Sequence, residues 1–317
     1  MLFLFVDTFV MATDGFVAYR SNTISGLNTP KISYWNNTNS SGNGSFSGEV
    51  ELATSGSPIR YVVLKQSPIN SKIVLMTSSD DGNVDGYVCM KNCTNPSEWI
   101  FSSNIGNTSL SAILNRSFDF GFESNSGDVL FVYGVLSSNV SQDLAYRVLL
   151  NNETNFSLTN INYIDDGGHA TDVQNLWVSI DSDPLNTSDE IIMAAFDDLN
   201  NDVNAWVWNG TAFGAINSIT DTATATANRE AHAVKYASDG SKGMVVAGNN
   251  TNGEFNSEYW DGSNWIILPT TDIDTADALD IQWLSLKADP SSDDLQLVAQ
   301  DSGSDLGTAY WNGSTWN

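Results

Sequence analysis

The chain has 317 residues, and its 38 acidic and 12 basic side chains give it a formal net charge of −26 at pH 7. A surface this acidic repels phosphate, so we expect neither nucleic acid nor an anionic membrane surface as a partner. No apolar stretch reaches the roughly 18 residues that a membrane-spanning helix requires, so we also expect no direct membrane insertion. Asp outnumbers Glu by 29 to 9, and with abundant Asn, Ser and Gly this indicates many turns.

The first segment, residues 1–12, is apolar, but Asp7 interrupts it and it lacks the basic residues that begin a signal peptide. We therefore expect it to form a strand. Residues 15–19 and 31–35 are expected as the second and third strands of a degenerate first repeat unit.

Five further units show the same order of segments. Each begins with an apolar strand, at 60–64, 118–122, 176–180, 232–236 and 282–286. A turn leads to a second strand, at 72–76, 128–133, 190–196, 243–248 and 294–299. A long polar loop then precedes the third strand, and a short turn leads to the fourth, as at 99–105 and 265–268.

The turn between the third and fourth strands carries the clearest repeat. It reads YWNGSTW at 310–316, YWDGSNW at 259–265 and, less closely, VWNGTAF at 207–213. Asn-Gly and Asp-Gly pairs accept the positive φ of a tight turn, so the two aromatic residues of each motif become cross-strand neighbours. The residues before the six turns lie 51 to 60 positions apart: Trp35, Met90, Leu150, Trp208, Trp260 and Trp311. Such a period predicts a stacked or radial repeat.

Six four-stranded antiparallel units of this size predict an all-β fold, a β-propeller of about six blades. The expected blades of this single domain are 1–53, 54–106, 107–164, 165–220, 221–273 and 274–317. The last blade lacks most of its fourth strand, which Leu2 to Val6 would supply by closing the ring. Because the sequence stops as the last hairpin turns back, we expect a fragment of a longer surface protein.

Glycosylation sequons and cysteines point to the cell exterior. The sequence holds thirteen Asn-x-Ser/Thr sequons, and this number favours glycosylation. They begin at Asn36, Asn39, Asn43, Asn92, Asn107, Asn115, Asn139, Asn152, Asn155, Asn186, Asn209, Asn249 and Asn312. The only cysteines, Cys89 and Cys93, either close a local disulfide in an oxidising compartment or remain two free thiols. Two thiols without a nearby His argue against zinc.

The Trp-Asn/Asp-Gly-Ser-x-Trp motif resembles repeats in extracellular propeller proteins of bacteria and archaea. Its spacing is also similar to the outer hairpin of the six-bladed fucose-binding lectins, and the resemblance covers Ser117 to Asn317. It implies a propeller fold and, in the lectins, a sugar site with an Arg on the second strand and a Glu on the third. Here Glu258 is the only acid close to that Glu, and after Arg20 no second strand contains an Arg. The resemblance therefore extends to the turn motif and does not extend to the residues of the fucose site.

The links between blades contain the candidate ligand-binding residues. In a propeller, these links and the loops between second and third strands emerge on the face where most ligands bind. A His beside carboxylates suits a general base or a metal ligand, although the same residues also suit a polar rim without a ligand. The candidates are Arg116, Asp165, Asp166, His169, Asp172, Arg229, Glu230 and His232.

Acidic loops in three units suggest calcium. Their oxygen-bearing residues alternate, and alternate residues of an extended loop point the same way, as a cation with six to eight oxygen ligands requires. The candidate ligands are Asp81, Asn83, Asp85, Asp198, Asn200, Asp202, Asp301 and Asp305. Position twelve is Asn92 in the first loop and Asn209 in the second, so these loops are not EF-hands. The alternative is that Asp and Asn are turn residues only.

Two further interpretations concern catalysis and the tryptophans. A propeller glycosidase would need paired carboxylates, for which Asp119, Asp172 and Asp280 lie near the starts of first strands, but no catalytic signature is present. Trp177 and Trp283 occupy one repeated position, and Trp208, Trp260 and Trp311 another. Repetition at equivalent positions favours packing between blades over sugar stacking.

We therefore expect an extracellular or cell-surface, non-catalytic module for recognition or adhesion, whose partner is a surface glycan or protein. The alternatives are a structural subunit of a surface layer or filament, which would self-associate, and a polysaccharide-acting glycoside hydrolase. The only cofactor expected is calcium.

Overall fold

The computed structural model describes the chain except for eleven short segments. These are residues 1–13, 22–25, 37–44, 109–114, 136–138, 140, 166–174, 222, 224–228, 250–252 and 274–278. The strand expected at residues 1–12 and its ring-closing role lie outside the described residues. The chain divides into two compact units, one of Met1–Ile113 with Asn152–Thr159 and one of Leu114–Asn151 with Asn160–Asn317.

The first unit contains two antiparallel sheets. Sheet 1 consists of β1 (Asp14–Arg20), β2 (Pro30–Asn36), β3 (Ser45–Phe46) and β4 (Val50–Glu51), in which β2 pairs with the other three. Sheet 2 consists, in order, of β5 (Ile59–Gln66), β6 (Ile73–Ser79), β7 (Asn83–Cys89) and β8 (Trp99–Asn107). The 3-10 helix η2 (Pro96–Glu98) precedes β8, and η3 (Phe156–Leu158) packs against it.

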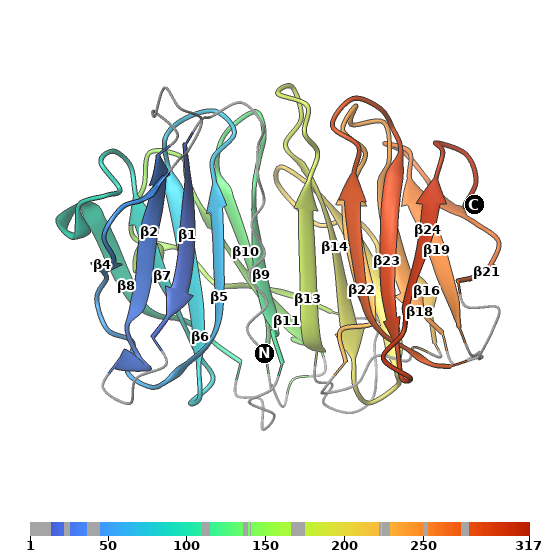
Figure 1. The fold of residues 1–317 in the computed structure, drawn as a ribbon, viewed down its shortest axis with the longest axis horizontal. Coiled ribbons are helices and arrows are strands. Elements are labelled where there is room, and N and C mark those ends of the chain that lie inside the picture. The colour runs from blue at the N-terminus through green and yellow to red at the C-terminus, as the bar shows by residue number, and fades with distance from the viewer. Residues whose placement is uncertain are drawn as a thin grey trace. The chain divides into compact units, whose positions relative to one another are not determined.

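The second unit contains four antiparallel sheets. Sheet 3 consists of β9 (Phe118–Phe122), β10 (Val129–Gly134), β11 (Leu144–Leu149) and β12 (Asn162–Ile164). Sheet 4 consists of β13 (Asn175–Ser182), β14 (Glu190–Asp197), β15 (Asp202–Asn209) and β16 (Asn217–Thr220). Sheet 5 consists of β17 (His232–Tyr236), β18 (Gly243–Gly248), β19 (Glu254–Trp260), β20 (Trp265–Ile267) and β21 (Thr271–Asp272). Sheet 6 consists of β22 (Ile281–Ala288), β23 (Leu295–Asp301) and β24 (Leu306–Trp311), which lie side by side in orange and red in Figure 1.

Each sheet is formed by one continuous stretch of chain, and consecutive sheets of the second unit meet through their first strands. β9 packs against β13, β13 against β17, and β17 against β22. Backbone bonds join some of them directly, since the Val178 N–H donates to the Arg116 carbonyl and the Leu284 N–H to the Glu230 carbonyl, both at 3.2 Å. Antiparallel sheets in this succession are the blades of a β-propeller. The predicted fold class is therefore confirmed.

The core lies between the faces of neighbouring sheets. One apolar cluster joins sheets 3 and 4, including Leu130, Val132, Met193 and Trp206. In the first unit a second cluster joins sheets 1 and 2, including Ile32, Leu75, Tyr87 and Trp99. Strands covered on both faces need no alternation of polar residues, which explains continuous apolar runs such as β10.

The repeated tryptophans belong largely to this core. Trp177, Trp208 and Trp311 are between 1% and 3% exposed, which confirms the predicted packing role for these three. Trp260 and Trp283 are half-buried. The Trp177 and Trp283 rings meet edge to face, with centroids 5.8 Å apart.

The Asn/Asp-Gly motifs form the predicted hairpins. The rings of Trp260 and Trp265 lie 5.7 Å apart, and those of Trp311 and Trp316 lie 5.6 Å apart. In each hairpin the Gly has a positive φ, +88° at Gly262. Only Gly adopts this backbone conformation without strain, which explains why every copy of the motif keeps it.

A disulfide replaces this turn in sheet 2. Cys89, the last residue of β7, is bonded to Cys93. The Trp99 indole N–H donates to the Cys93 carbonyl at 3.0 Å, so the aromatic residue that follows the turn is fixed to the closed loop. Of the two possibilities that the sequence left open, the structure therefore has the disulfide.

We expect Gly262→Ala to lower the free energy of unfolding by about 1 kcal/mol, because an L-residue in the left-handed region is strained. A Cβ at Gly262 would meet no atom within 4 Å, so backbone strain is the only cause of the loss. The control is Gly48→Ala, where a Cβ also meets nothing and φ is not positive. Urea denaturation should show a loss for Gly262→Ala alone, and equal behaviour of the two variants would contradict the explanation.

Candidate functional site

Arg116 ties three successive sheets together. It precedes β9, and its Nη1 donates to the Phe118 carbonyl at 3.0 Å within sheet 3. Its Nη2 donates to Ser179 Oγ of sheet 4 at 3.4 Å and to Glu230 Oε1 at the start of sheet 5. Asp119 Oδ2 lies 3.5 Å from Nη1. The structure thus brings two predicted ligand-binding residues, Arg116 and Glu230, into a largely buried ion pair with each other.

His232, the first residue of β17, lies beside this ion pair. It is 1% exposed, and neither ring nitrogen has a hydrogen-bond partner in the described structure. Burial, helped by the positive charge of Arg116, lowers its pKa from 6.5 to about 3. The imidazole is therefore neutral at physiological pH, and a base in this position has no access to solvent.

Arg229 and Asp165 do not join this cluster. The Arg229 guanidinium lies 3.9 Å from Asp280, and both side chains are about a third or more exposed. Asp165 follows β12, at the opposite edge of sheet 3 from β9. Three strand spacings, roughly 14 Å, separate these edges. The other predicted ligand-binding residues, Asp166, His169 and Asp172, lie outside the described residues.

Asp119, one of the three carboxylates considered for a glycosidase, has structural partners. Asp119 accepts hydrogen bonds from the backbone N–H groups of Phe120 at 2.8 Å and Ile180 at 2.9 Å. Asp181 does the same one sheet later, for the Tyr236 N–H at 2.7 Å. In both cases a carboxylate of one first strand binds the backbone of the next first strand. Sequence reasoning did not predict this clamp, although an Asp within an apolar strand is a signal for it.

The acidic loops are held by their own hydrogen bonds. Asp81 accepts bonds from Ser79 Oγ and from both the backbone and the side chain of Asn83, and Asp85 accepts one from the Asn104 N–H. The Asp81 contacts are those of an ordinary turn residue, whereas the Asp85 contact joins β7 to β8.

The other two loops are similar. Asn200 Nδ2 donates to Asp197, while Asp198 is exposed and Asp202 is half-buried. Asp301 accepts the Asp305 N–H at 2.9 Å, and its other oxygen is buried without a partner. Within the described ranges, no three His, Cys, Asp or Glu residues are grouped to hold a metal ion. Calcium binding stays a prediction.

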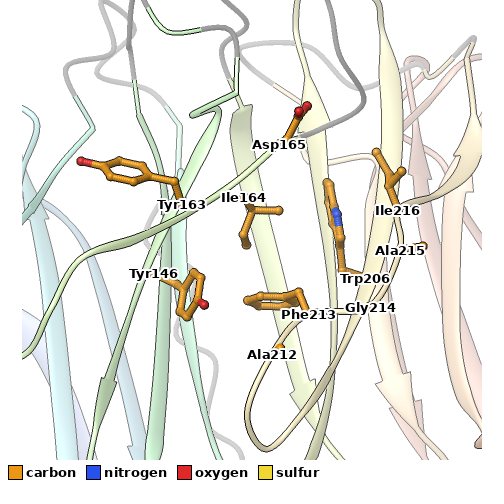
Figure 2. Close-up of a pocket in the computed structure, with 10 residues that line it drawn as sticks. All are labelled: Tyr146, Tyr163, Ile164, Asp165, Trp206, Ala212, Phe213, Gly214, Ala215 and Ile216. Carbon is orange, nitrogen blue, oxygen red and sulfur yellow. The ribbon is translucent and has the colours of Figure 1, made fainter.

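A pocket of about 550 Å³ opens between sheets 3 and 4. Tyr146 of β11, Trp206 of β15 and Phe213 of the sheet 4 hairpin supply its aromatic walls, and Asp165 stands at its rim. Figure 2 shows the Tyr146 and Phe213 rings close to one another, while the Tyr163 ring points away from them. The Tyr146 and Phe213 centroids lie 5.3 Å apart at 81°. The predicted ligand-binding residue Asp165 thus belongs to this pocket. The sequence analysis did not identify the aromatic residues of the pocket as ligand-binding residues.

The pocket combines apolar and polar groups. Tyr146 and Phe213 are half-buried, and burial raises the pKa of the Tyr146 hydroxyl. That hydroxyl has no hydrogen-bond partner in the part of the chain that the structure describes. The lining also includes the exposed residues Ala212, Gly214, Ala215 and Ile216. A signal in the sequence was available, because Phe213 occupies the second aromatic position of the hairpin motif.

Unlike the residues that line the pocket, Glu258 is not open to a ligand. It is 5% exposed, its Oε2 accepts a bond from Asn217 Nδ2 at 2.8 Å, and burial raises its pKa. The one acid near the position of the lectin Glu is therefore a buried contact between sheets 4 and 5.

Comparisons with known proteins bear on the fold. No protein-family model matches the chain. No curated protein matches it either. A solved structure of a triple-arginine mutant of AofleA from Arthrobotrys oligospora is similar with a TM-score of 0.50 and 12% identity, over 96% of this chain and 85% of that one.

Two further solved structures are similar over 96% of this chain. A protein provisionally named 6-phosphogluconolactonase, from Bacteroides uniformis, has a TM-score of 0.52, 11% identity and 80% coverage of its own chain. A fungal lectin from Aleuria aurantia, described as a six-bladed β-propeller that recognises fucose, has a TM-score of 0.45, 13% identity and 94% coverage. At these identities the structures from Arthrobotrys oligospora and Bacteroides uniformis show a shared fold and nothing about a ligand.

We expect Arg116→Met to lower the free energy of unfolding by about 2 to 4 kcal/mol, because it leaves Glu230 largely buried without its cation. Arg229→Met is the matched control, since its guanidinium is more exposed than that of Arg116 and its loss should cost less than about 1 kcal/mol. Urea denaturation of both variants measures the difference. A cost for Arg116→Met no larger than for Arg229→Met would contradict its role as the joint between sheets.

We expect His232 to make the protein less stable in mild acid. Its folded pKa lies below the unfolded value of 6.5, so its stabilising contribution is complete above pH 6.5 and is lost as the pH falls toward 3. Between pH 6.5 and 4.5 the loss is about 2 to 3 kcal/mol. His232→Leu should lack this acid-induced loss of stability and be at least as stable as wild type at pH 7. Substitution of His169, the only other histidine in the sequence, should leave the acid-induced loss unchanged. Equal pH dependence in wild type and His232→Leu would exclude this origin.

Proposed function

We propose that this chain is a non-catalytic recognition module that binds carbohydrate in the pocket between sheets 3 and 4. The observation that carries the proposal is the pocket itself. Its volume of about 550 Å³ lies within the roughly 300 to 1,000 Å³ of small-molecule sites. Apolar walls with a few polar groups are typical of such sites.

The wall chemistry suits a sugar better than other small ligands. The C–H face of a pyranose ring packs on an aromatic ring, while its hydroxyls need hydrogen-bond partners at the edge. Tyr146 and Phe213 supply half-buried rings, and the Tyr146 hydroxyl and the Asp165 carboxylate supply polar partners. A carboxylate at the rim, on a chain of net charge −26, disfavours acidic sugars and phosphorylated ligands.

Two observations support a location outside the cytoplasm. Disulfides such as Cys89–Cys93 persist in oxidising compartments, and the hairpin motif resembles that of extracellular propellers. Among the described residues, no helix is long and apolar enough to cross a membrane. Adhesion to a protein partner and self-association into a surface layer or filament stay predictions.

The proposal is tested by filling the pocket. A glycan array identifies a ligand for the purified chain, and titration calorimetry then compares wild type, Ala215→Trp and Ala53→Trp. Ala215 is exposed and lines the pocket, so a Trp there should occupy the ligand volume and weaken binding by at least about tenfold. Ala53 is an exposed alanine in the first unit, and its replacement should leave binding unchanged.

The negative outcomes are informative as well. Unchanged affinity of Ala215→Trp would place the sugar elsewhere and overturn the assignment of this pocket. Silence of the folded wild-type chain on the array would overturn carbohydrate recognition and leave a protein partner as the explanation for the pocket.

A further inference from the structure

The hairpins of sheets 4 and 6 each place a glycosylation sequon at an exposed tip. These are Asn209-Gly-Thr and Asn312-Gly-Ser, and both asparagines are exposed. Asn209 Oδ1 accepts hydrogen bonds from the backbone N–H groups of Thr211 and Ala212, both at 3.0 Å. Asn312 Oδ1 accepts the equivalent bonds from Ser314 at 3.0 Å and Thr315 at 2.9 Å. The side-chain oxygen thus holds each turn.

The side-chain nitrogen is not needed for this turn. The hairpin of sheet 5 has Asp261 at the same position, and its Oδ1 accepts bonds from the backbone N–H groups of Ser263 at 2.9 Å and Asn264 at 2.7 Å. A carboxylate has no N–H to donate, so the oxygen alone suffices. Neither Asn209 nor Asn312 donates a hydrogen bond from Nδ2 within the described structure. At these two tips the asparagine is exposed, and the turn places no demand on its amide nitrogen.

The hydroxyl of each sequon is already positioned. Thr211 Oγ1 donates to Asn209 Oδ1 at 2.8 Å, and Ser314 Oγ donates to Asn312 Oδ1 at 2.8 Å. This is the side chain that distinguishes a glycosylation acceptor from any other Asn. In both hairpins the folded turn therefore presents the Asn side chain and the Ser or Thr hydroxyl of the sequon next to each other.

Two other sequons, at Asn115 and Asn249, are placed where a glycan has no room. Asn115 is 7% exposed, with both polar side-chain atoms buried. Asn249 is 6% exposed, and its Nδ2 donates to Asn256 Oδ1 at 3.1 Å. Asn107 is exposed, but its Nδ2 donates to Asn83 Oδ1 at 3.1 Å. A sugar on Asn115 or Asn249 would have to displace packed chain, while one on Asn209 or Asn312 displaces only water.

We propose that Asn209 and Asn312 carry N-linked glycans. The sugar donor is an oligosaccharide held on a polyprenyl phosphate or pyrophosphate carrier. Nδ2 forms a bond to the anomeric carbon of the first sugar, the bond from that carbon to the carrier phosphate oxygen breaks, and the carrier leaves as its phosphate or pyrophosphate. Nδ2 gives one proton to the base of the transferase and keeps the other. Oδ1 keeps its lone pairs, so the hydrogen bonds of the turn survive the modification. This proposal does not depend on the proposed ligand.

The test is expression in a host that secretes the chain through an N-glycosylating pathway, followed by mass spectrometry of its glycopeptides. We expect high occupancy at Asn209 and Asn312, and at most a few per cent at Asn115 and Asn249. Asn209→Gln or Asn312→Gln should abolish the glycan at the substituted tip and leave the other tip modified.

The sheet 5 hairpin gives a gain-of-modification test. Asp261→Asn creates Asn-Gly-Ser in a turn that the structure shows to be equivalent, so a new glycan should appear on residue 261. Adding Ser263→Ala to this variant should remove it. The proposal is overturned if Asn209 and Asn312 stay unmodified, whether or not other sequons are occupied, or if the buried Asn115 and Asn249 are modified to the same extent as the tips.

Discussion

A single guanidinium group connects three sheets of the second unit. Arg116 is bonded to the Phe118 carbonyl of its own sheet, to Ser179 of the next and to Glu230 at the start of the one after. Its five donors in a fixed planar fork make such a junction possible, which a lysine could not form. The unpartnered His232 lies beside it, so a second positive charge in this region is strongly disfavoured. The Arg116 cation therefore helps to hold these first strands in place, together with the Asp119 and Asp181 clamps.

Much of this fold follows from patterns that are local in the chain. The paired aromatics and the Asn/Asp-Gly turns fix the outer hairpins, because turn chemistry and cross-strand contact involve residues only a few positions apart. Apolar runs between turn residues locate the first and second strands to within a few residues. The tryptophans at repeated positions indicate packing, and Trp177, Trp208 and Trp311 are buried as this reasoning implies.

The candidate site was less accessible to such reasoning. Arg116 and Glu230 were identified by type and location, but sequence alone does not show that they neutralise each other across 114 positions. Asp119 was a candidate glycosidase carboxylate only because it lies near the start of a first strand, and the sequence does not show that it binds the backbone of Ile180 in another sheet. The pocket joins Tyr146 to Phe213 from two sheets, and their meeting depends on inter-sheet packing rather than on any local pattern. Local chemistry predicts elements, whereas pockets and ion pairs between sheets require the packed structure.

The sequence at the hairpin tips also affects deamidation, the spontaneous loss of the amide nitrogen from an Asn side chain. An Asn followed by Gly is the pair most prone to spontaneous loss of its amide nitrogen, because Gly leaves the next backbone nitrogen free to attack the side chain. Asn209-Gly210 and Asn312-Gly313 are such pairs. When this reaction yields Asp, the product has the side chain that sheet 5 already uses at Asp261, with the same oxygen accepting the same two backbone N–H groups. A turn that relies on oxygen alone therefore survives this form of chemical damage, and a sugar on the nitrogen would block the damage at its source.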